Sequence, residues 1–278
     1  MSKICLPTNY YQQFDADFDR DVPGEGFGGW KKANLTLNLE RTAIVVMHAW
    51  DCGTQEQFPG WHRTVEYLLR SYDICEKVFP ELLTAVRSSP LKLIHVVSSE
   101  DYSSHYPGYR LVKELAGATS GIERAEADEV LKELRAFRAA NVFPGSHNQP
   151  DITRGRTMMK FAREAEPVGN ELIAETSHEL FRLCQHFGIN HLIYTGFAIN
   201  GCLWTSPGGM YDMMRHGVMC SAIRQAVTAI ENKETAREER AKEIALWQVA
   251  LLYGFVYDSD DFITALRDSG SKRLTIHD

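Results

Sequence analysis

Several features that define common protein classes are missing from this sequence. It has no run of about 20 apolar residues, so we expect no membrane span. It has no basic excess, because 37 acidic residues outnumber 30 basic ones and give a formal charge of -7, which argues against a nucleic-acid partner. The N-terminus, where Pro7 and Asn9 soon follow Lys3, has no apolar region typical of a signal peptide. We therefore expect a cytoplasmic protein that acts on a small molecule.

Motifs for cofactors and for cysteine frameworks are also absent. A Gly-x-Gly-x-x-Gly sequence after a strand and a Walker sequence are both missing, so we expect no nucleotide cofactor. The six cysteines are scattered without a Cys-x-x-Cys pair, which argues against a disulfide framework and a zinc ribbon.

The sequence does contain a regular alternation of apolar strand-like runs and helix-like segments. We expect strands at about 42–47, 91–97, 157–161, 189–195, 218–222 and 254–257, and helices at about 62–88, 171–187 and 234–253. The chain of 278 residues, 44% of them hydrophobic, is long enough for one large domain. The pattern predicts an α/β fold, a three-layer α/β/α arrangement around a mainly parallel, roughly six-stranded Rossmann-like sheet.

Breaker residues suggest two additions to this domain, which we place at 41–278. Residues 1–40 carry Pro7, Pro23 and a glycine cluster at 24–29, so we expect an irregular N-terminal arm. An amphipathic segment at about 122–140 precedes the breaker cluster at 143–147. We interpret about 106–150 as an inserted helical segment or lid.

Four reactive side chains lie at or just beyond the carboxyl ends of predicted strands: His48, Glu100, Lys160 and Cys202. Ligands of parallel sheets bind at that edge, so these side chains are expected to converge on one pocket. Cys202 follows a turn with two glycines and is predicted to begin a helix, a position that favours a nucleophilic thiolate. A buried cysteine on an ordinary glycine turn is the alternative.

The segment Gly196-Phe197-Ala198-Ile199-Asn200-Gly201-Cys202 resembles the Gly-x-Ala-Thr-Asn-x-Cys motif of the isochorismatase-like cysteine hydrolases, which include nicotinamidase, N-carbamoylsarcosine amidase and ureidoacrylate amidohydrolase. The resemblance extends from about residue 42 to 257. It implies that Cys202 is the nucleophile and Lys160 the catalytic lysine. It also implies an oxyanion hole made by the amides of Ala198 and Cys202, and a cis peptide between Phe197 and Ala198.

The first strand departs from that family. The family has an aspartate base in an Asp-x-Gln sequence, whereas this chain has His48 at that place, followed by Trp50 and Asp51. A neutral imidazole can take the thiol proton, but it does not balance the charge of the lysine. Asp51, Glu100 or another carboxylate would have to supply that charge. A shifted alignment makes Asp51 itself the base, and loss of catalysis is the third interpretation.

The surroundings of the predicted site suggest an aromatic wall for a flat or apolar substrate, although each aromatic residue alone also fits a core or an interface. Pro207, Gly208 and Gly209 are expected to break the helix after the cysteine and remodel the rim. Some nicotinamidase-like relatives bind a metal, but Asp51, His62, Asp101 and His105 lack the spacing of that motif, so we expect none. The predicted pocket residues are Trp50, Asp51, Phe58, Trp61, Glu100, Phe197 and Trp204.

Two functions follow from these features. The first is a cofactor-independent hydrolase that cleaves a small amide, ureide or carbamoyl C–N bond through a thioester on Cys202, with His48 as the base. The second is a non-catalytic relative that binds a small ligand or serves as an assembly subunit. The resemblance also implies a homo-oligomer, either a dimer or a tetramer.

Overall fold

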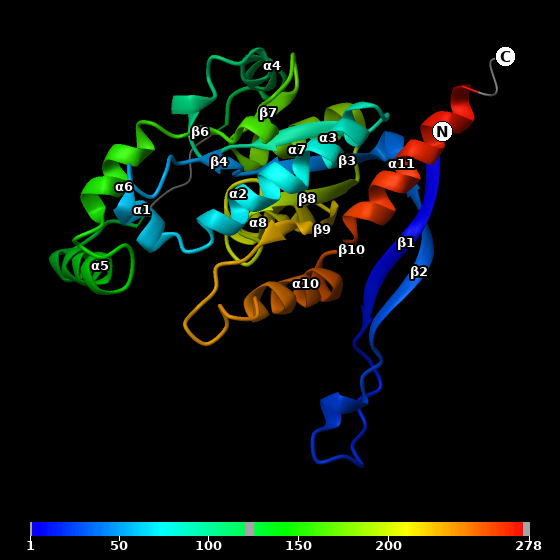
Figure 1. The fold of residues 1–278 in the computed structure, drawn as a ribbon, viewed down its shortest axis with the longest axis horizontal. Coiled ribbons are helices and arrows are strands. Elements are labelled where there is room, and N and C mark those ends of the chain that lie inside the picture. The colour runs from blue at the N-terminus through cyan, green and yellow to red at the C-terminus, as the bar shows by residue number, and fades with distance from the viewer. Residues whose placement is uncertain (1, 120–124, 275–278) are drawn as a thin grey trace.

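An eight-stranded sheet forms the middle of the computed structural model, which describes residues 2–119 and 125–274, except for the side chains of Glu100 and 271–274 (Figure 1). Its strands lie in the order β2 (Gly29–Asn38), β1 (Lys3–Gln12), β10 (Val256–Tyr257), β9 (Met219–Thr228), β8 (His191–Phe197), β3 (Thr42–Met47), β5 (Lys92–Val96) and β7 (Leu172–Ala174). The six strands from β10 to β7 are parallel, and β1 and β2 are added antiparallel. The predicted mainly parallel sheet is confirmed, with a hairpin attached.

Helices cover both faces of this sheet, because its central strands are apolar on both sides. Along β3, Ile44 and Val46 join one hydrophobic cluster, and Val45 and Met47 join the other. The first face is covered by α2 (Leu68–Lys77), α3 (Phe79–Arg87) and α11 (Ser259–Leu274). The second is covered by α4 (Pro107–Ala116), α7 (Ser177–Phe187), α8 (Cys202–Thr205), α9 (Met210–Arg215) and α10 (Arg240–Leu252). The three-layer α/β/α fold is therefore confirmed.

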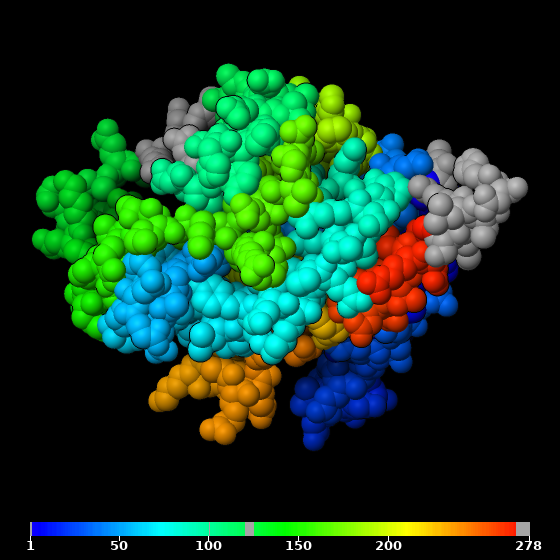
Figure 2. All heavy atoms as spheres, turned by 45° about the horizontal axis from the view of Figure 1, so that its top comes forward, coloured from blue at the N-terminus to red at the C-terminus, as the bar shows by residue number. Residues whose placement is uncertain are grey.

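The N-terminal segment is not an irregular arm, so that prediction is wrong. β1 and β2 pair in an unbroken antiparallel register from Lys3↔Asn38 to Gln12↔Gly29. Ile4, Leu6 and Thr8 alternate as buried residues along β1, and this period of two is enough for a strand despite the proline between them. The hairpin tip, residues 13–28 with the 3₁₀ turn η1 (Pro23–Gly26), projects from the body in Figures 1 and 2.

The predicted strand at 157–161 also differs. Only β6 (Lys160–Phe161) forms there, and it pairs with β4 (Trp50–Asp51) in a separate two-stranded sheet. The edge of the main sheet is instead β7, which occupies the start of the predicted helix at 171–187. The helix α7 begins later because Thr176 and Glu179 form a capping box, and it ends at Gly188 in the left-handed conformation, as predicted.

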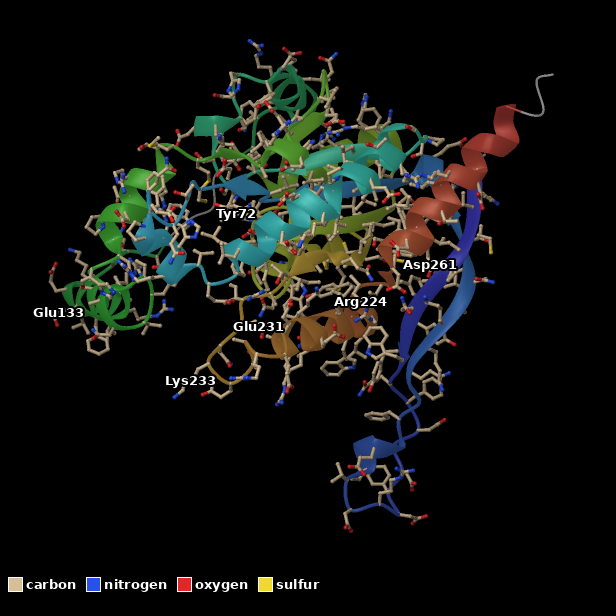
Figure 3. The ribbon with its side chains drawn as sticks, in the orientation of Figure 1. Tyr72, Glu133, Arg224, Glu231, Lys233 and Asp261 are labelled. Carbon is tan, nitrogen blue, oxygen red and sulfur yellow. The ribbon has the colours of Figure 1, made fainter. Side chains whose placement is uncertain are left out.

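The segment 106–150 is only partly an insertion. α4 packs on α7 and β7 as a layer helix, at such close range that a Cβ on Gly108 would lie 1.8 Å from the Glu171 carbonyl oxygen. α5 (Glu129–Asn141) has no buried residue, and Glu133 marks it at the edge of the molecule in Figure 3. The predicted amphipathic segment starts at about 122, and its residues 122–124 lie outside the described part.

Helix α11 follows the last predicted strand and packs Phe262, Ile263 and Leu266 into the core. The elements not yet placed are short. They are η2 (Leu39–Arg41), α1 (Pro59–Thr64), η3 (Glu100–Tyr102), α6 (Gln149–Arg156) and η4 (Arg163–Ala165). Within residues 2–119 and 125–274, no helix is long and apolar enough to cross a membrane.

Candidate active site

A cavity of about 640 Å³ lies at the carboxyl edge of the sheet, where the strand order reverses between β3 and β8. β5 and β7 lie on one side of β3, and β8, β9 and β10 lie on the other, so loops leaving adjacent strands diverge here. The cavity is lined by His48, Trp50, Trp61, Thr64, Val65, Glu66, Tyr67, Ser98, Ser99, Asp101, Tyr102, Phe143, Ile152, Arg156, Met159, Cys202, Ser206 and Ile230.

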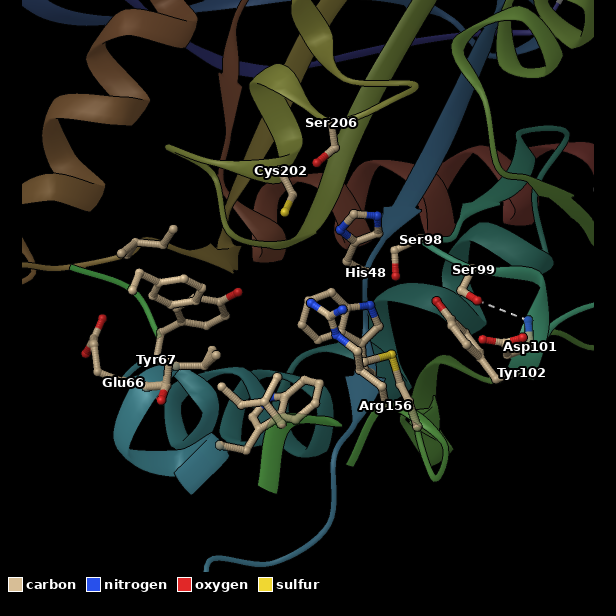
Figure 4. A pocket seen from close by; sticks show the side chains of 18 residues that line it. His48, Glu66, Tyr67, Ser98, Ser99, Asp101, Tyr102, Arg156, Cys202 and Ser206 are labelled. Atoms are coloured by element: carbon tan, nitrogen blue, oxygen red, sulfur yellow. Dashed lines mark hydrogen bonds between the residues drawn. The ribbon is translucent and has the colours of Figure 1, made fainter. Parts of the chain in front are cut away.

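Cys202 is the first residue of α8 and is half-buried in the cavity wall (Figure 4). The turn before it requires glycine at position 196, where φ is 108° and a Cβ would lie 1.9 Å from the Met47 carbonyl oxygen. The turn is held in place by Asn200, whose side chain donates to the Ile230 carbonyl and accepts from the Ile230 amide, both at 2.8 Å. The Phe197–Ala198 peptide is cis, as predicted.

The amides proposed as an oxyanion hole lie on this turn. The carbonyl of Ala198 accepts hydrogen bonds from the amides of Gly201 and Leu203, both at 3.1 Å, which closes the turn on itself. The amides of Ala198 and Cys202 donate no hydrogen bond to another group in the described ranges. Of the two residues, Cys202 lines the cavity and Ala198 is fully buried behind it, and their role as an oxyanion hole stays a prediction.

His48 follows β3 and lies in the same cavity, where Figure 4 shows its imidazole near the Cys202 thiol. Its backbone has φ of 53°, and its amide donates to the Val96 carbonyl at 3.0 Å. The side chain is only 5% exposed and stacks on Trp50 with ring centroids 5.3 Å apart. Burial lowers the pKa of His48 from 6.5 to about 4, so the imidazole is neutral at pH 7. Its Nδ1 has no partner among the described protein atoms.

The structure does not bring Lys160 to Cys202. The pairing of β4 with β6 sets Lys160 opposite Asp51, and the Lys160 Nζ lies 3.2 Å from the Asp51 carboxylate. Both residues line a second pocket, and the Lys160 side chain is 71% exposed. The residue before it, Met159, lines the cavity instead. The expected Cys202–Lys160 pair is therefore not formed, and Asp51 is not placed as a base for the thiol.

The other predicted pocket residues divide into two groups. Trp50 and Trp61 line the cavity. Phe58, Phe197 and Trp204 do not, since each packs elsewhere in the interior. Phe58 packs with Trp61 and Leu68, Phe197 stacks on Phe79 with centroids 6.0 Å apart, and Trp204 lies near Tyr253. The side chain of Glu100 lies outside the described part.

Sequence reasoning missed several residues of the cavity. Ser98 and Ser99 follow β5 directly, so their position at the carboxyl edge was a usable clue. Tyr67 lies in the wall near the thiol, and burial together with the neighbouring Cys202 raises its pKa above the ordinary value. Arg156 lies in the last turn of α6, and nothing in the neighbouring sequence indicates that it lines the cavity.

The metal candidates do not form a cluster. No group of three or more His, Cys, Asp or Glu side chains suited to a metal ion occurs within residues 2–119 and 125–274. His62 has its Nε2 2.9 Å from the Gly53 carbonyl oxygen, and Asp51 pairs with Lys160.

Comparison with known proteins gives matches in structure only. No family model matches the sequence, and no curated protein matches it. A cysteine hydrolase from Pseudomonas syringae pv. phaseolicola is similar, with 13% identity and a TM-score of 0.47 over 84% of this chain and 95% of that chain. An isochorismatase family protein from Burkholderia thailandensis has 14% identity and a TM-score of 0.46 over 83% and 97%. A pyrazinamidase/nicotinamidase from Streptococcus mutans has 8% identity and a TM-score of 0.35 over 78% and 99%.

Proposed function

We propose that this chain is an isochorismatase-like cysteine hydrolase that cleaves a C–N bond of a small amide, ureide or carbamoyl compound without a cofactor. The observation that carries the proposal is that Cys202 and a neutral, buried His48 leave adjacent strands and line one cavity at the switch point of the sheet. A thiol and a base in one cavity, with backbone amides on the turn that carries the thiol, are the parts that acyl transfer needs.

The reaction proceeds in two steps on these residues. The Cys202 sulfur attacks the carbonyl carbon while a ring nitrogen of His48 takes the thiol proton. The amides of Ala198 and Cys202 stabilise the negative oxygen, and the C–N bond breaks as His48 returns the proton to the leaving nitrogen. Water then loses a proton to His48 and attacks the thioester. The sulfur leaves, regains that proton and releases the acid.

The charge state of the site determines when the proton moves. Because burial holds the pKa of His48 near 4, an imidazolium in the resting enzyme is unfavourable. A preformed thiolate–imidazolium pair is therefore disfavoured, and proton transfer accompanies the attack of sulfur on the carbonyl. The lysine ammonium expected from the resemblance takes no part, since it is paired with Asp51.

A second function is favoured by one specific observation. The Nδ1 of His48 has no hydrogen-bonding partner among the described protein atoms, whereas a catalytic histidine is usually oriented by a carboxylate or a carbonyl. A cavity in which no protein group orients His48 suits a non-catalytic protein that binds a small ligand or acts as an assembly subunit. In that case ligands raise the melting temperature without being consumed.

The test is intact-mass spectrometry after exposure to a panel of small amides and ureides, with product analysis. We expect an acyl adduct on the wild-type protein, none on Cys202→Ala, and turnover lowered at least about 100-fold in His48→Asn. Cys5→Ser is the matched control, because Cys5 is an exposed cysteine on β1, and it should behave as wild type. Ligand-induced stabilisation without adduct or product would favour the binding function. The predicted homo-oligomer is checked by the solution mass from light scattering.

A further inference from the structure

Arg156 is the cationic side chain of the cavity, and its charge is not neutralised by the protein. It makes no ion pair or hydrogen bond from its guanidinium within the described ranges. Its neighbour on the same helix, Arg154, is tied to the Asp151 carboxylate at 3.1 Å and to the Gln57 carbonyl. The two arginines of α6 therefore differ: one fixes the helix and the other is available to a ligand.

The acidic groups on the cavity wall do not cancel this charge. Glu66 accepts two hydrogen bonds of 2.9 Å from Arg70 and one of 2.8 Å from the amide of Glu231. Asp101 lies on an exposed part of the rim, and it forms no ion pair with Arg156. Figure 4 shows Arg156 and Asp101 on different parts of the wall. Among the described lining residues, Asp101 is the carboxylate without an ion pair, and it would compete with a ligand's anion for Arg156.

The wall around Arg156 combines aromatic and aliphatic surface with the hydroxyl groups of Thr64, Ser98, Ser99 and Ser206. Trp50, Trp61 and Tyr67 supply ring surfaces, and Ile152 and Met159 supply aliphatic surface. The Trp61 indole N–H is buried and has no acceptor among the described protein atoms. Because this N–H has almost no accessible surface, it does not face the cavity, and Arg156 is the group on this wall that attracts a ligand's anion. A guanidinium without a protein partner in this cavity selects for ligand oxygens.

Resting on the hydrolase proposed above, we propose that its substrates are monocarboxylates, in which a carboxylate binds Arg156 and an apolar or aromatic body packs against the indole wall. A carboxylate matches the planar guanidinium with two parallel hydrogen bonds. A phosphate dianion is a poorer match, because Arg156 is the one cationic side chain among the lining residues. Arg156 is then a residue that determines specificity, and the amide to be cleaved is held at Cys202.

The test is calorimetric titration with N-benzoylglycine and N-benzoylglycinamide, which share a ring and an amide and differ in the carboxylate. N-benzoylglycine should bind at least about 10-fold more tightly to the wild-type protein. Arg156→Gln, which keeps the length of the side chain, should weaken that binding about 10- to 100-fold and remove the difference between the two probes. Arg156→Lys should retain part of the preference. Arg138→Gln, the matched control on helix α5, which has no buried residue, should retain all of it.

Several results would overturn this assignment: equal binding of both probes, no binding of either probe, or unchanged binding in Arg156→Gln. Competition by inorganic phosphate as effective as by benzoate would show a general anion site and would also overturn it. Titrating Cys202→Ala separates the two proposals, because binding through Arg156 does not need the thiol. Charge-selective binding without an acyl adduct on any amide would leave this inference standing while the hydrolase fails.

Discussion

Burial of a neutral His48 should make the stability of the fold depend on pH in a specific way. The unfolded chain takes up a proton on His48 below its ordinary pKa of 6.5, whereas the folded chain does so only near pH 4. The contribution is therefore fully present above pH 6.5 and is lost as the pH falls toward 4. The difference between 6.5 and about 4 corresponds to about 3 kcal/mol, of which about 2 to 3 kcal/mol is lost by pH 4.5.

The perturbation that isolates this effect is His48→Asn. Asparagine tolerates the positive φ of 53° at this position, so the backbone is retained. His95 and His191 are also buried with lowered pKa values, but they are the same in both proteins, and their contribution cancels in the difference. Urea unfolding at pH 7 and pH 4.5 should show the wild-type protein losing about 2 to 3 kcal/mol more than the variant. Equal losses in both proteins would refute the neutral, buried state of His48.

The remaining predictions concern three positions of the motif: Lys160, Gly196 and His48. Lys160→Met should change turnover or ligand binding less than about 2-fold, because the Lys160 ammonium is exposed and paired with Asp51. A loss of about 100-fold would show that Lys160 acts in catalysis. Gly196→Ala should cost more than about 3 kcal/mol in urea unfolding, because the added Cβ meets the Met47 carbonyl at 1.9 Å. His48→Asp should lower both stability and any activity; an increase in turnover would mean that the histidine has disabled an ancestral site.

The parts of the fold that were predictable from sequence are those set by local pattern. β3, β5 and β8 are short apolar runs buried on both faces, and such runs identify central parallel strands without any knowledge of their neighbours. The helix break at Pro207 was also predictable, and α8 and α9 do flank it. The hairpin β1–β2 was hidden because its proline and glycines outweighed a weak alternation of buried residues.

The sequence around β6 did not predict which of its neighbouring side chains faces the cavity. Lys160 and Met159 are adjacent, and only the pairing of β6 with β4 decides which of them enters the cavity. That pairing joins segments about 110 residues apart, so no local pattern records it. Arg156 enters the cavity for a similar reason, since the helix α6 reaches the site by packing against α1.

The two departures from the pattern that the resemblance implies, at His48 and at Lys160, have one electrostatic explanation. An aspartate and a lysine can share a closed cavity because each balances the other's charge. With the Lys160 ammonium paired to Asp51 outside the cavity, an aspartate at position 48 would be a buried carboxylate without a cation beside it. Such a group would be protonated or would destabilise the fold. A neutral imidazole has no such charge to balance, so a histidine fits the buried position 48 that this arrangement of Asp51 and Lys160 leaves.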